Sequence, residues 1–290
     1  MHRLLPSRRP AARRAGFTLV ELMVVVAIVG ILAGILVPAL GAVRAAGRAT
    51  KSQSNLRQWG AAMSAWTMNN NETLPWEGSK VAADMGNNLA YADFWPNALP
   101  SMLGIESYGA MCERAFQSQA TIEVWDNPDS VWNDPAAEPN RPEPYTFGGA
   151  GKNGIAHQFF FSYAMNYRMN QTLLIQEGLP EASRDVLMRM PQVSQPDKTV
   201  FMMELRASEL ELPANDPHRN GTLDRAIGGW KKFAARHSGG GHMTFSDGHV
   251  SWFANDEATT NRQGSRDPLT PGGDWNTDKL IWDALGPALN

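Results

Sequence analysis

An apolar run of 27 residues, Phe17 to Val43, limits what this chain can fold into more than any other feature. It contains one charged side chain, Glu21, and it is longer than the roughly 20 residues that a helix needs to cross a bilayer. It also exceeds the apolar segment of a secretory signal, which is about 7 to 15 residues long. The run therefore predicts a membrane-spanning helix.

Charge is distributed unevenly around this run. The first 16 residues carry five arginines and no acidic residue, whereas the rest of the chain holds 21 Lys and Arg against 29 Asp and Glu. Because basic residues favour the cytoplasmic side of a membrane, we expect a cytoplasmic N-terminus and an extracytoplasmic remainder. The overall net charge of −3 gives no indication of nucleic-acid binding. The single cysteine, Cys112, cannot form an internal disulfide.

The residues at the start of the run carry a resemblance to a known signal. A basic leader ending in Gly16, followed by Phe17-Thr18-Leu19-Val20-Glu21, resembles the class III signal of type IV pilins and type II secretion pseudopilins. The resemblance implies that a prepilin peptidase cuts between Gly16 and Phe17 and methylates the new amino group of Phe17. It also implies that Glu21 directs assembly with other pilin or pseudopilin subunits in the inner membrane.

Elementary chemistry agrees with this implied role. A free α-amine has an ordinary pKa of about 8, so it is largely cationic at neutral pH. Four residues separate Phe17 from Glu21, which is about one helical turn. The carboxylate can therefore pair with the amine of its own chain or of a neighbouring subunit.

Helical periodicity continues beyond the apolar run, and it predicts one helix from Phe17 to about Asn70 that ends at Asn69-Asn70-Asn71 and Pro75. Pro38 cannot donate a hydrogen bond to the carbonyl of Gly34, so it is either a flexible point or the end of the span. The packing face is expected to hold Ala45, Ala49, Ser52, Leu56, Trp59, Met63 and Trp66. The opposite face is expected to hold Arg48, Lys51, Asn55 and Arg57.

The rest of the chain predicts a head with an antiparallel sheet, so the expected fold class is α+β and pilin-like. We expect a leader at 1–16, a long helix at 17–72 and the head at 73–290, with an irregular insertion at 127–154. Apolar runs at 158–162 and 199–203 predict strands. Asp247-Gly248, between two alternating runs, predicts a hairpin with a two-residue type I′ turn. That turn would pair Ser246 with His249, Phe245 with Val250, and Met243 with Trp252.

The same hairpin carries a second resemblance. His237, nine further residues and then Asp247-Gly248 reproduce the H-X9-DG signature of a bacterial family of prepilin-like proteins. The segments 52–66, 162–166 and 195–205 are also similar to that family. Asn127 departs from it, because the family often has cysteine there. We expect His237 to hydrogen-bond Asp247 or a backbone group of the turn.

No cofactor is expected. His237, His242, His249 and Asp247 could form a metal site, but their spacing is not diagnostic, so we expect none. Asp256 and Glu257 are loose candidates for binding calcium, because some pseudopilins that this chain resembles bind calcium through loop carboxylates. The sequence has no nucleophile motif such as G-x-S-x-G, and we expect no catalytic activity.

We therefore expect a subunit that assembles through its N-terminal helix into a type II secretion pseudopilus or a type IV pilus-like filament. One alternative is a single-pass anchored extracytoplasmic domain that binds a partner without polymerising, since ten tryptophans would suit a sugar-binding surface. Another is a secreted protein cut near Ala39-Leu40-Gly41.

Overall fold

The computed structural model describes residues 18–78, 88–118, 130–137, 146–147, 157–158, 161–170, 177–178, 186–219, 227–267, 269 and 274–285. Gly16 and Phe17 lie outside the described residues, as does most of the expected insertion at 127–154. The chain divides into two compact units with a boundary between Ala46 and Gly47. The last part of the long helix therefore belongs to the same unit as the sheet.

The N-terminal helix, α1, runs from Leu19 to Asn69, close to the predicted bounds. It continues through Pro38, so the proline does not end the helix. At its C-terminus, Asn71 has a φ of 53°, and the N–H of Glu72 donates to the carbonyl of Thr67 at 2.8 Å. Asparagine tolerates this left-handed conformation, so the asparagine run closes the helix as the sequence predicts.

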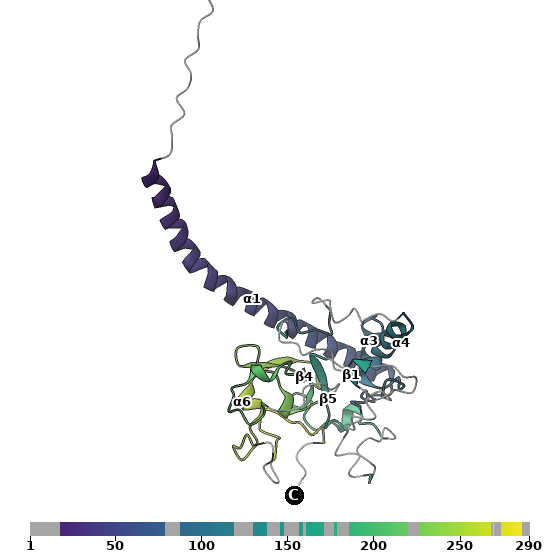
Figure 1. Cartoon of the computed structure of the whole chain (residues 1–290). Helices are drawn as coiled ribbons and strands as arrows, with labels where there is room; N and C mark the ends of the chain where they lie inside the picture. The colour runs from purple at the N-terminus through teal and green to yellow at the C-terminus, as the bar shows by residue number, and fades with distance from the viewer. Residues whose placement is uncertain are drawn as a thin grey trace, which may run out of the picture. The chain divides into compact units, whose positions relative to one another are not determined.

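The head is built on a five-stranded sheet with the strand order β5-β3-β4-β6-β7 (Figure 1). Four neighbouring strands are antiparallel, and the short edge strand β5 pairs in parallel with β3. The long helix and the antiparallel strands confirm the α+β, pilin-like fold class. The strands are β3 (Tyr163–Asn166), β4 (Val200–Glu204), β5 (Ile227–Gly228), β6 (Gly240–Phe245) and β7 (Val250–Ala254).

The two strand predictions had different outcomes. The strand predicted at 199–203 is β4. Of the strand predicted at 158–162, Gln158 lies in the short strand His157–Gln158, residues 159 and 160 lie outside the described residues, and Phe161 and Ser162 are not in a strand. Phe161 instead packs its ring 5.2 Å from the ring of Trp95, measured between centroids. Phe161 is therefore a core residue and not a strand residue.

Smaller elements complete the described head. Two further helices, α3 and α4, precede the sheet in the chain, and a one-turn helix, α6, follows β7. Their bounds are α3 (Trp95–Met102), α4 (Tyr108–Ser118) and α6 (Asn255–Ala258). A two-residue ladder joins β1 (Thr146–Phe147) to β2 (His157–Gln158), and 3-10 helices occur at η3 (Met190–Gln192), η4 (Glu209–Glu211) and η5 (Trp230–Lys232).

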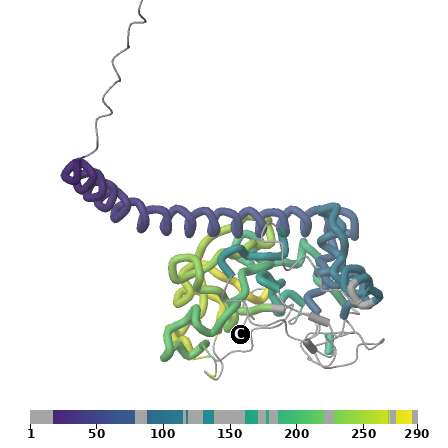
Figure 2. The backbone as a smooth tube through the Cα atoms, turned by 45° about the horizontal axis from the view of Figure 1, so that its top comes forward, coloured from purple at the N-terminus to yellow at the C-terminus, as the bar shows by residue number. Residues whose placement is uncertain are grey.

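The sheet separates two apolar clusters. Tyr163 and Met165 of β3 belong to the cluster that contains Leu56 and Trp59 of α1, whereas Ala164 belongs to the second cluster. Because successive strand residues point to opposite faces, α1 covers one face of the sheet. Figure 2 shows residues 47–69 of α1 running along the head.

The predicted packing face of α1 is right from Ser52 to Met63, but Ala45 at its start is exposed, and one residue assigned to the opposite face is buried. Ser52, Leu56, Trp59 and Met63 are fully buried. Asn55 was expected on the opposite face, yet it is also fully buried, and its side-chain amide donates to the carbonyl of Asn133 at 2.9 Å. The periodicity counted an amide as an exposed residue, whereas a partner from a distant loop makes its burial favourable.

The predicted hairpin exists, but its turn and register are wrong. Thr244 pairs with Val250 and His242 with Trp252, one residue out of the predicted register. The N–H of Gly248 donates to the carbonyl of Phe245, and at this turn only Gly248 has positive φ, at 90°. This is a three-residue loop, and not the predicted type I′ turn. Because side chains alternate along a strand, a shift of one residue changes which side chains share a face.

The hairpin lies directly against α1. The hydroxyl of Thr244 donates to the carbonyl of Leu56 at 3.0 Å. A Cβ added to Gly60 would lie 2.9 Å from a Thr244 carbon and 3.1 Å from the carbonyl oxygen of Gly248. Glycine at position 60 therefore permits the close approach between helix and hairpin.

Candidate functional site

The first candidate site is the apolar half of α1. Every Leu, Ile, Val and Met from Leu19 to Val43 is 45–73% exposed. Among the described residues, α1 is the one helix that is long and apolar enough to cross a membrane, and its most apolar 18-residue stretch is not buried by the chain. The exposed side chains include the consecutive residues 22–26, so they surround the helix. A helix that is apolar on all sides needs lipid or other helices around it.

Glu21 is held at the first turn of this helix. Its carboxylate accepts hydrogen bonds from the backbone N–H and the hydroxyl of Thr18, both at 2.8 Å. The N–H of Glu21 donates in turn to the Thr18 hydroxyl at 3.2 Å. This reciprocal pattern is a capping box, which stabilises a helix N-terminus. The sequence Thr18-Leu19-Val20-Glu21 carries the usual Thr-x-x-Glu signal of a capping box, which was not among the predictions.

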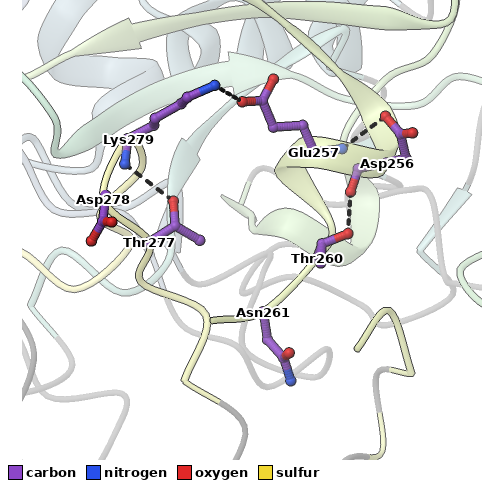
Figure 3. A pocket seen from close by; sticks show the side chains of 7 residues that line it. All are labelled: Asp256, Glu257, Thr260, Asn261, Thr277, Asp278 and Lys279. Atoms are coloured by element: carbon purple, nitrogen blue, oxygen red, sulfur yellow. Dashed lines mark hydrogen bonds and ion pairs between the residues drawn. The ribbon is translucent and has the colours of Figure 1, made fainter. Parts of the chain in front are cut away.

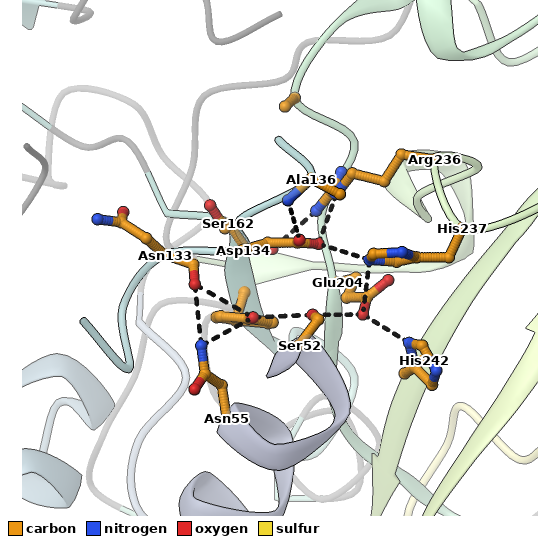
Figure 4. A network of polar contacts seen from close by, with 12 residues as sticks. Ser52, Asn55, Asn133, Asp134, Ala136, Ser162, Glu204, Arg236, His237 and His242 are labelled. Carbon is orange, nitrogen blue, oxygen red and sulfur yellow. Dashed lines mark hydrogen bonds and ion pairs between the residues drawn. The ribbon is translucent and has the colours of Figure 1, made fainter. Parts of the chain in front are cut away.

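The second candidate site is a buried polar cluster around His237 in the head (Figure 4). Nδ1 of His242 lies 2.8 Å from Oε1 of Glu204, and Nε2 of His237 lies 3.5 Å from the same oxygen. Nε2 of His237 also lies 3.1 Å from Oδ2 of Asp134. All four side chains are at most 8% exposed. Two imidazoles and two carboxylates thus meet inside the head.

Arg236 neutralises one side of this cluster. Its Nε donates to Oδ2 of Asp134 at 2.5 Å, and its Nη1 donates to Oε1 of Glu211 at 2.9 Å. A further guanidinium hydrogen bond reaches the carbonyl of Leu205 at 2.6 Å. Charged groups are buried only when paired, and Arg236 provides that pairing for two carboxylates.

The other side of the cluster reaches α1. The hydroxyl of Ser52 donates to Oε1 of Glu204 at 2.6 Å and lies 2.8 Å from the hydroxyl of Tyr163. The side-chain amide of Asn55 contacts the same Tyr163 hydroxyl at 3.3 Å. The cluster therefore connects the sheet to the helix through hydrogen bonds as well as through apolar packing.

Burial and neighbouring charges act in opposite directions on the pKa values of His237 and Asp134, and in the same direction on the pKa of Tyr163. Burial by itself would lower the pKa of His237, but the neighbouring carboxylates of Asp134 and Glu204 raise it above its ordinary value. Burial by itself would raise the pKa of Asp134, but Arg236 and His237 lower it. Burial and the nearby carboxylates raise the pKa of Tyr163, so its hydroxyl stays protonated.

The predicted partner of His237 is wrong. His237 contacts Asp134 and Glu204, whereas Asp247 accepts hydrogen bonds from the backbone N–H of His249 at 3.0 Å and contacts its Nδ1 at 2.6 Å. Asp247 is exposed and His237 is buried, and their side chains have different partners. The histidine and the aspartate of the H-X9-DG signature are therefore not hydrogen-bonded to each other. Gly248 nevertheless lies against α1 at Gly60.

The calcium candidates lie at the surface, in an open polar pocket shown in Figure 3. Nζ of Lys279 lies 2.5 Å from Oε1 of Glu257, and the N–H of Glu257 donates to Oδ1 of Asp256. The ammonium group of Lys279 is therefore already the cationic partner of the Glu257 carboxylate, where a calcium ion would have to bind. The pocket is lined by Asp256, Glu257, Thr260, Asn261, Thr277, Asp278 and Lys279.

Most of the described tryptophans are in the core. Trp59, Trp95 and Trp132 pack together, with ring centroids 5.0 to 5.9 Å apart, and all three are at most 2% exposed. Trp252 is 45% exposed. The described residues therefore do not form a tryptophan-rich surface. Cys112 is also buried, and burial raises the pKa of its thiol to about 12.

Sequence reasoning missed Glu204 and Asp134 as partners of His237. A signal for Glu204 was present, because it stands at the end of the apolar run 200–203. A carboxylate in such a run is expected to be buried and paired. No comparable signal marked Asp134, which lies in a segment that the sequence analysis treated as irregular.

Comparison with known proteins bears on the N-terminal site. Residues 11–37 match the family model of the prokaryotic N-terminal methylation motif. None of the curated proteins and none of the solved structures compared with the chain matches it. The motif indicates a prepilin-processed protein of the type IV pilin or pseudopilin kind, a class of structural subunits. Together with the apolar half of α1, it indicates a single-pass membrane-anchored protein.

Proposed function

We propose that this chain is a filament subunit that assembles through the first half of α1 into a type II secretion pseudopilus or a type IV pilus-like filament. The observation that carries the proposal is an apolar helix, uncovered on all sides, that contains a single carboxylate. A membrane would cover this helix before assembly, and a bundle of identical helices would cover it afterwards.

In this proposal the carboxylate selects the partner. A charge inside a membrane segment is unfavourable unless it has a counter-charge, so Glu21 favours a site that provides one. Cleavage between Gly16 and Phe17 would create a cationic amine one helical turn away. Thr18 holds the carboxylate in the isolated chain, and the amine of a neighbouring subunit would replace part of that contact during assembly.

The proposal also fixes a topology. Residues 1–16 are the cytoplasmic leader that prepilin peptidase removes, residues 17–72 are the long helix, and residues 73–290 are the head outside the inner membrane. The five arginines of the leader support this orientation through the positive-inside bias. We assign the segment 237–248 a structural role, because Thr244 and Gly248 contact α1 and His237 reaches it through Glu204.

Processing can be tested on the protein purified from membranes. Intact mass and N-terminal sequencing should show a mature chain that begins with methylated Phe17. A chain that still begins with the arginine-rich leader, in cells with normal filaments, would contradict the proposal. A chain that begins after Gly41 would instead identify an ordinary secreted protein.

Assembly can be tested with pairs of cysteines on the exposed helix, for example Val24→Cys with Ile35→Cys, because both positions are more than half exposed. Oxidation in membranes should give ladders of crosslinked subunits. The buried native Cys112 should not contribute. The matched control carries Glu21→Val in addition and should stay monomeric. Monomers from every pair tested along residues 20–40 would favour a non-polymerising anchor.

A further inference from the structure

We propose that Glu204, His237 and His242 bind a divalent metal ion of the zinc class inside the head. One donor atom from each of the three residues lies within 4.8 Å of the other two. The residues come from β4, from the loop before β6 and from β6 itself, so the fold and not the sequence brings them together. No metal was expected from the sequence, because the spacing of His237, His242, His249 and Asp247 is not diagnostic and Glu204 was not among the candidates.

The distances suit a small four-coordinate ion. Ligand bonds of about 2.0 to 2.2 Å place tetrahedral donor atoms about 3.4 Å apart. Oε1 of Glu204 lies 2.8 Å from Nδ1 of His242 and 3.5 Å from Nε2 of His237. To bind an ion here, Oε1 of Glu204 and Nδ1 of His242 would move apart by about 0.6 Å, and the three donor atoms, which lie within 4.8 Å of one another, would close around the ion.

The donor set indicates the class of ion. Imidazole nitrogens are ligands for zinc and neighbouring transition metals, whereas calcium and magnesium prefer oxygen ligands. Two imidazoles and one carboxylate form a known zinc ligand set. The three side chains are at most 8% exposed, so an ion here would be enclosed by protein.

A second observation at Glu204 is independent of the distances. Its Oε1 contacts Ser52 and both histidines, whereas its Oε2 is buried without a hydrogen-bond partner among the residues that the structure describes. An orphaned carboxylate oxygen is unfavourable inside a protein. An ion bound by the carboxylate would satisfy it. Position 241 is glycine, and a Cβ added there would lie 2.8 Å from Oε2, so glycine keeps a side chain away from this oxygen.

The local charges also favour a cation. Within the described residues, the ion pairs of Glu204 are with His237 and His242 alone, since Arg236 is paired with Asp134 and Glu211. A divalent ion would balance Glu204 while both histidines remain neutral, the form in which imidazole binds metals. Because Ser52 of α1 donates to Glu204, the ion would also strengthen the connection between sheet and helix.

Metal content of the full-length protein, purified in detergent without added chelator, tests the proposal. We expect about one zinc-class ion per chain by mass spectrometry. Glu204→Gln and His242→Ala should lower zinc affinity by more than about 100-fold, since loss of a ligand exceeds the 10- to 100-fold effect of losing an outer partner. The matched control, His249→Ala, removes an exposed histidine on the same hairpin and should retain the ion.

Wild-type protein provides a measurement that does not depend on the folding of variants. After removal of metal by a chelator, added Co²⁺ should produce the visible absorption bands of a tetrahedral site, and added Zn²⁺ should raise the melting midpoint. The proposal would be overturned if wild-type protein contained no metal, showed no Co²⁺ bands and had a melting midpoint that did not change with Zn²⁺. Retention of the ion by both Glu204→Gln and His242→Ala would overturn it as well.

Discussion

Two glutamates stand in apolar runs of this chain, one in the first half of α1 and one in β4. Glu21 is exposed, and its contacts are with Thr18, three residues away in the sequence. Glu204 is fully buried, and its contacts come from Ser52, His237 and His242. The same sequence signal therefore marks two different carboxylates. Among the described residues, the hydrogen-bond partner of the Glu21 side chain is local, whereas the side-chain partners of Glu204 lie far away in the sequence.

The difference teaches how each region obtains its stability. The first half of α1 buries none of its most apolar stretch within the chain, so its energy depends on lipid or on other subunits. The head buries an apolar core and the charged cluster around Glu204 and Arg236, so its energy depends on contacts that the fold provides. A substitution in one region should leave the property of the other unchanged.

The largest expected effect is at Glu21. Glu21→Val should abolish filaments while membrane insertion and the melting midpoint of the head stay unchanged, because valine suits lipid but offers no counter-charge to an amine. Filament yield after shearing, membrane fractionation and thermal unfolding would measure the three properties. Filaments of normal yield from this variant would refute the role of Glu21.

The next effect is at Glu204. Glu204→Ala should lower the free energy of unfolding of the head by about 3 to 5 kcal/mol, because removal of one partner leaves buried polar groups unpaired. Urea unfolding followed by the fluorescence of the Trp59, Trp95 and Trp132 cluster would measure it. His249→Ala, on the exposed turn, should change the free energy by less than about 0.5 kcal/mol. Equal losses from both variants would contradict the comparison.

A smaller effect is expected where α1 enters the head. Asn55→Ala should lower the free energy of unfolding by about 1 to 3 kcal/mol, because it removes the buried hydrogen bond from the Asn55 amide to the carbonyl of Asn133. Arg57→Ala, two residues later on the exposed face, should stay within about 0.5 kcal/mol. The same urea titration distinguishes the two variants. A larger loss from Arg57→Ala than from Asn55→Ala would show that the packing face of α1 is assigned incorrectly.

The smallest effect is expected at Thr18. Thr18→Ala removes the helix cap and should cost about 1 kcal/mol at the first turn of α1, with little effect on filament yield. Hydrogen exchange of the first-turn amides and the shearing assay would measure the two results. If Thr18→Ala abolished filaments as Glu21→Val is expected to do, Glu21 would act as a cap and not as an assembly residue.

Features that depend on neighbouring residues were predicted well. The span and end of α1, strand β4 and the presence of the β6–β7 hairpin all follow from local hydrophobicity, periodicity and turn residues. The register of the hairpin was not predicted, because Asp247-Gly248 fits both a two-residue and a three-residue loop. Which loop forms is decided by contacts with α1 at Leu56 and Gly60.

The sequence by itself determined that this protein has an apolar N-terminal helix with one carboxylate, because length, composition and spacing are local properties. Only the tertiary structure decided that His237 meets Asp134 and Glu204 and that Asn55 is buried. The physical reason is distance. A polar group is stable in the core only when packing brings a partner within about 3 Å, and that partner can lie anywhere in the sequence.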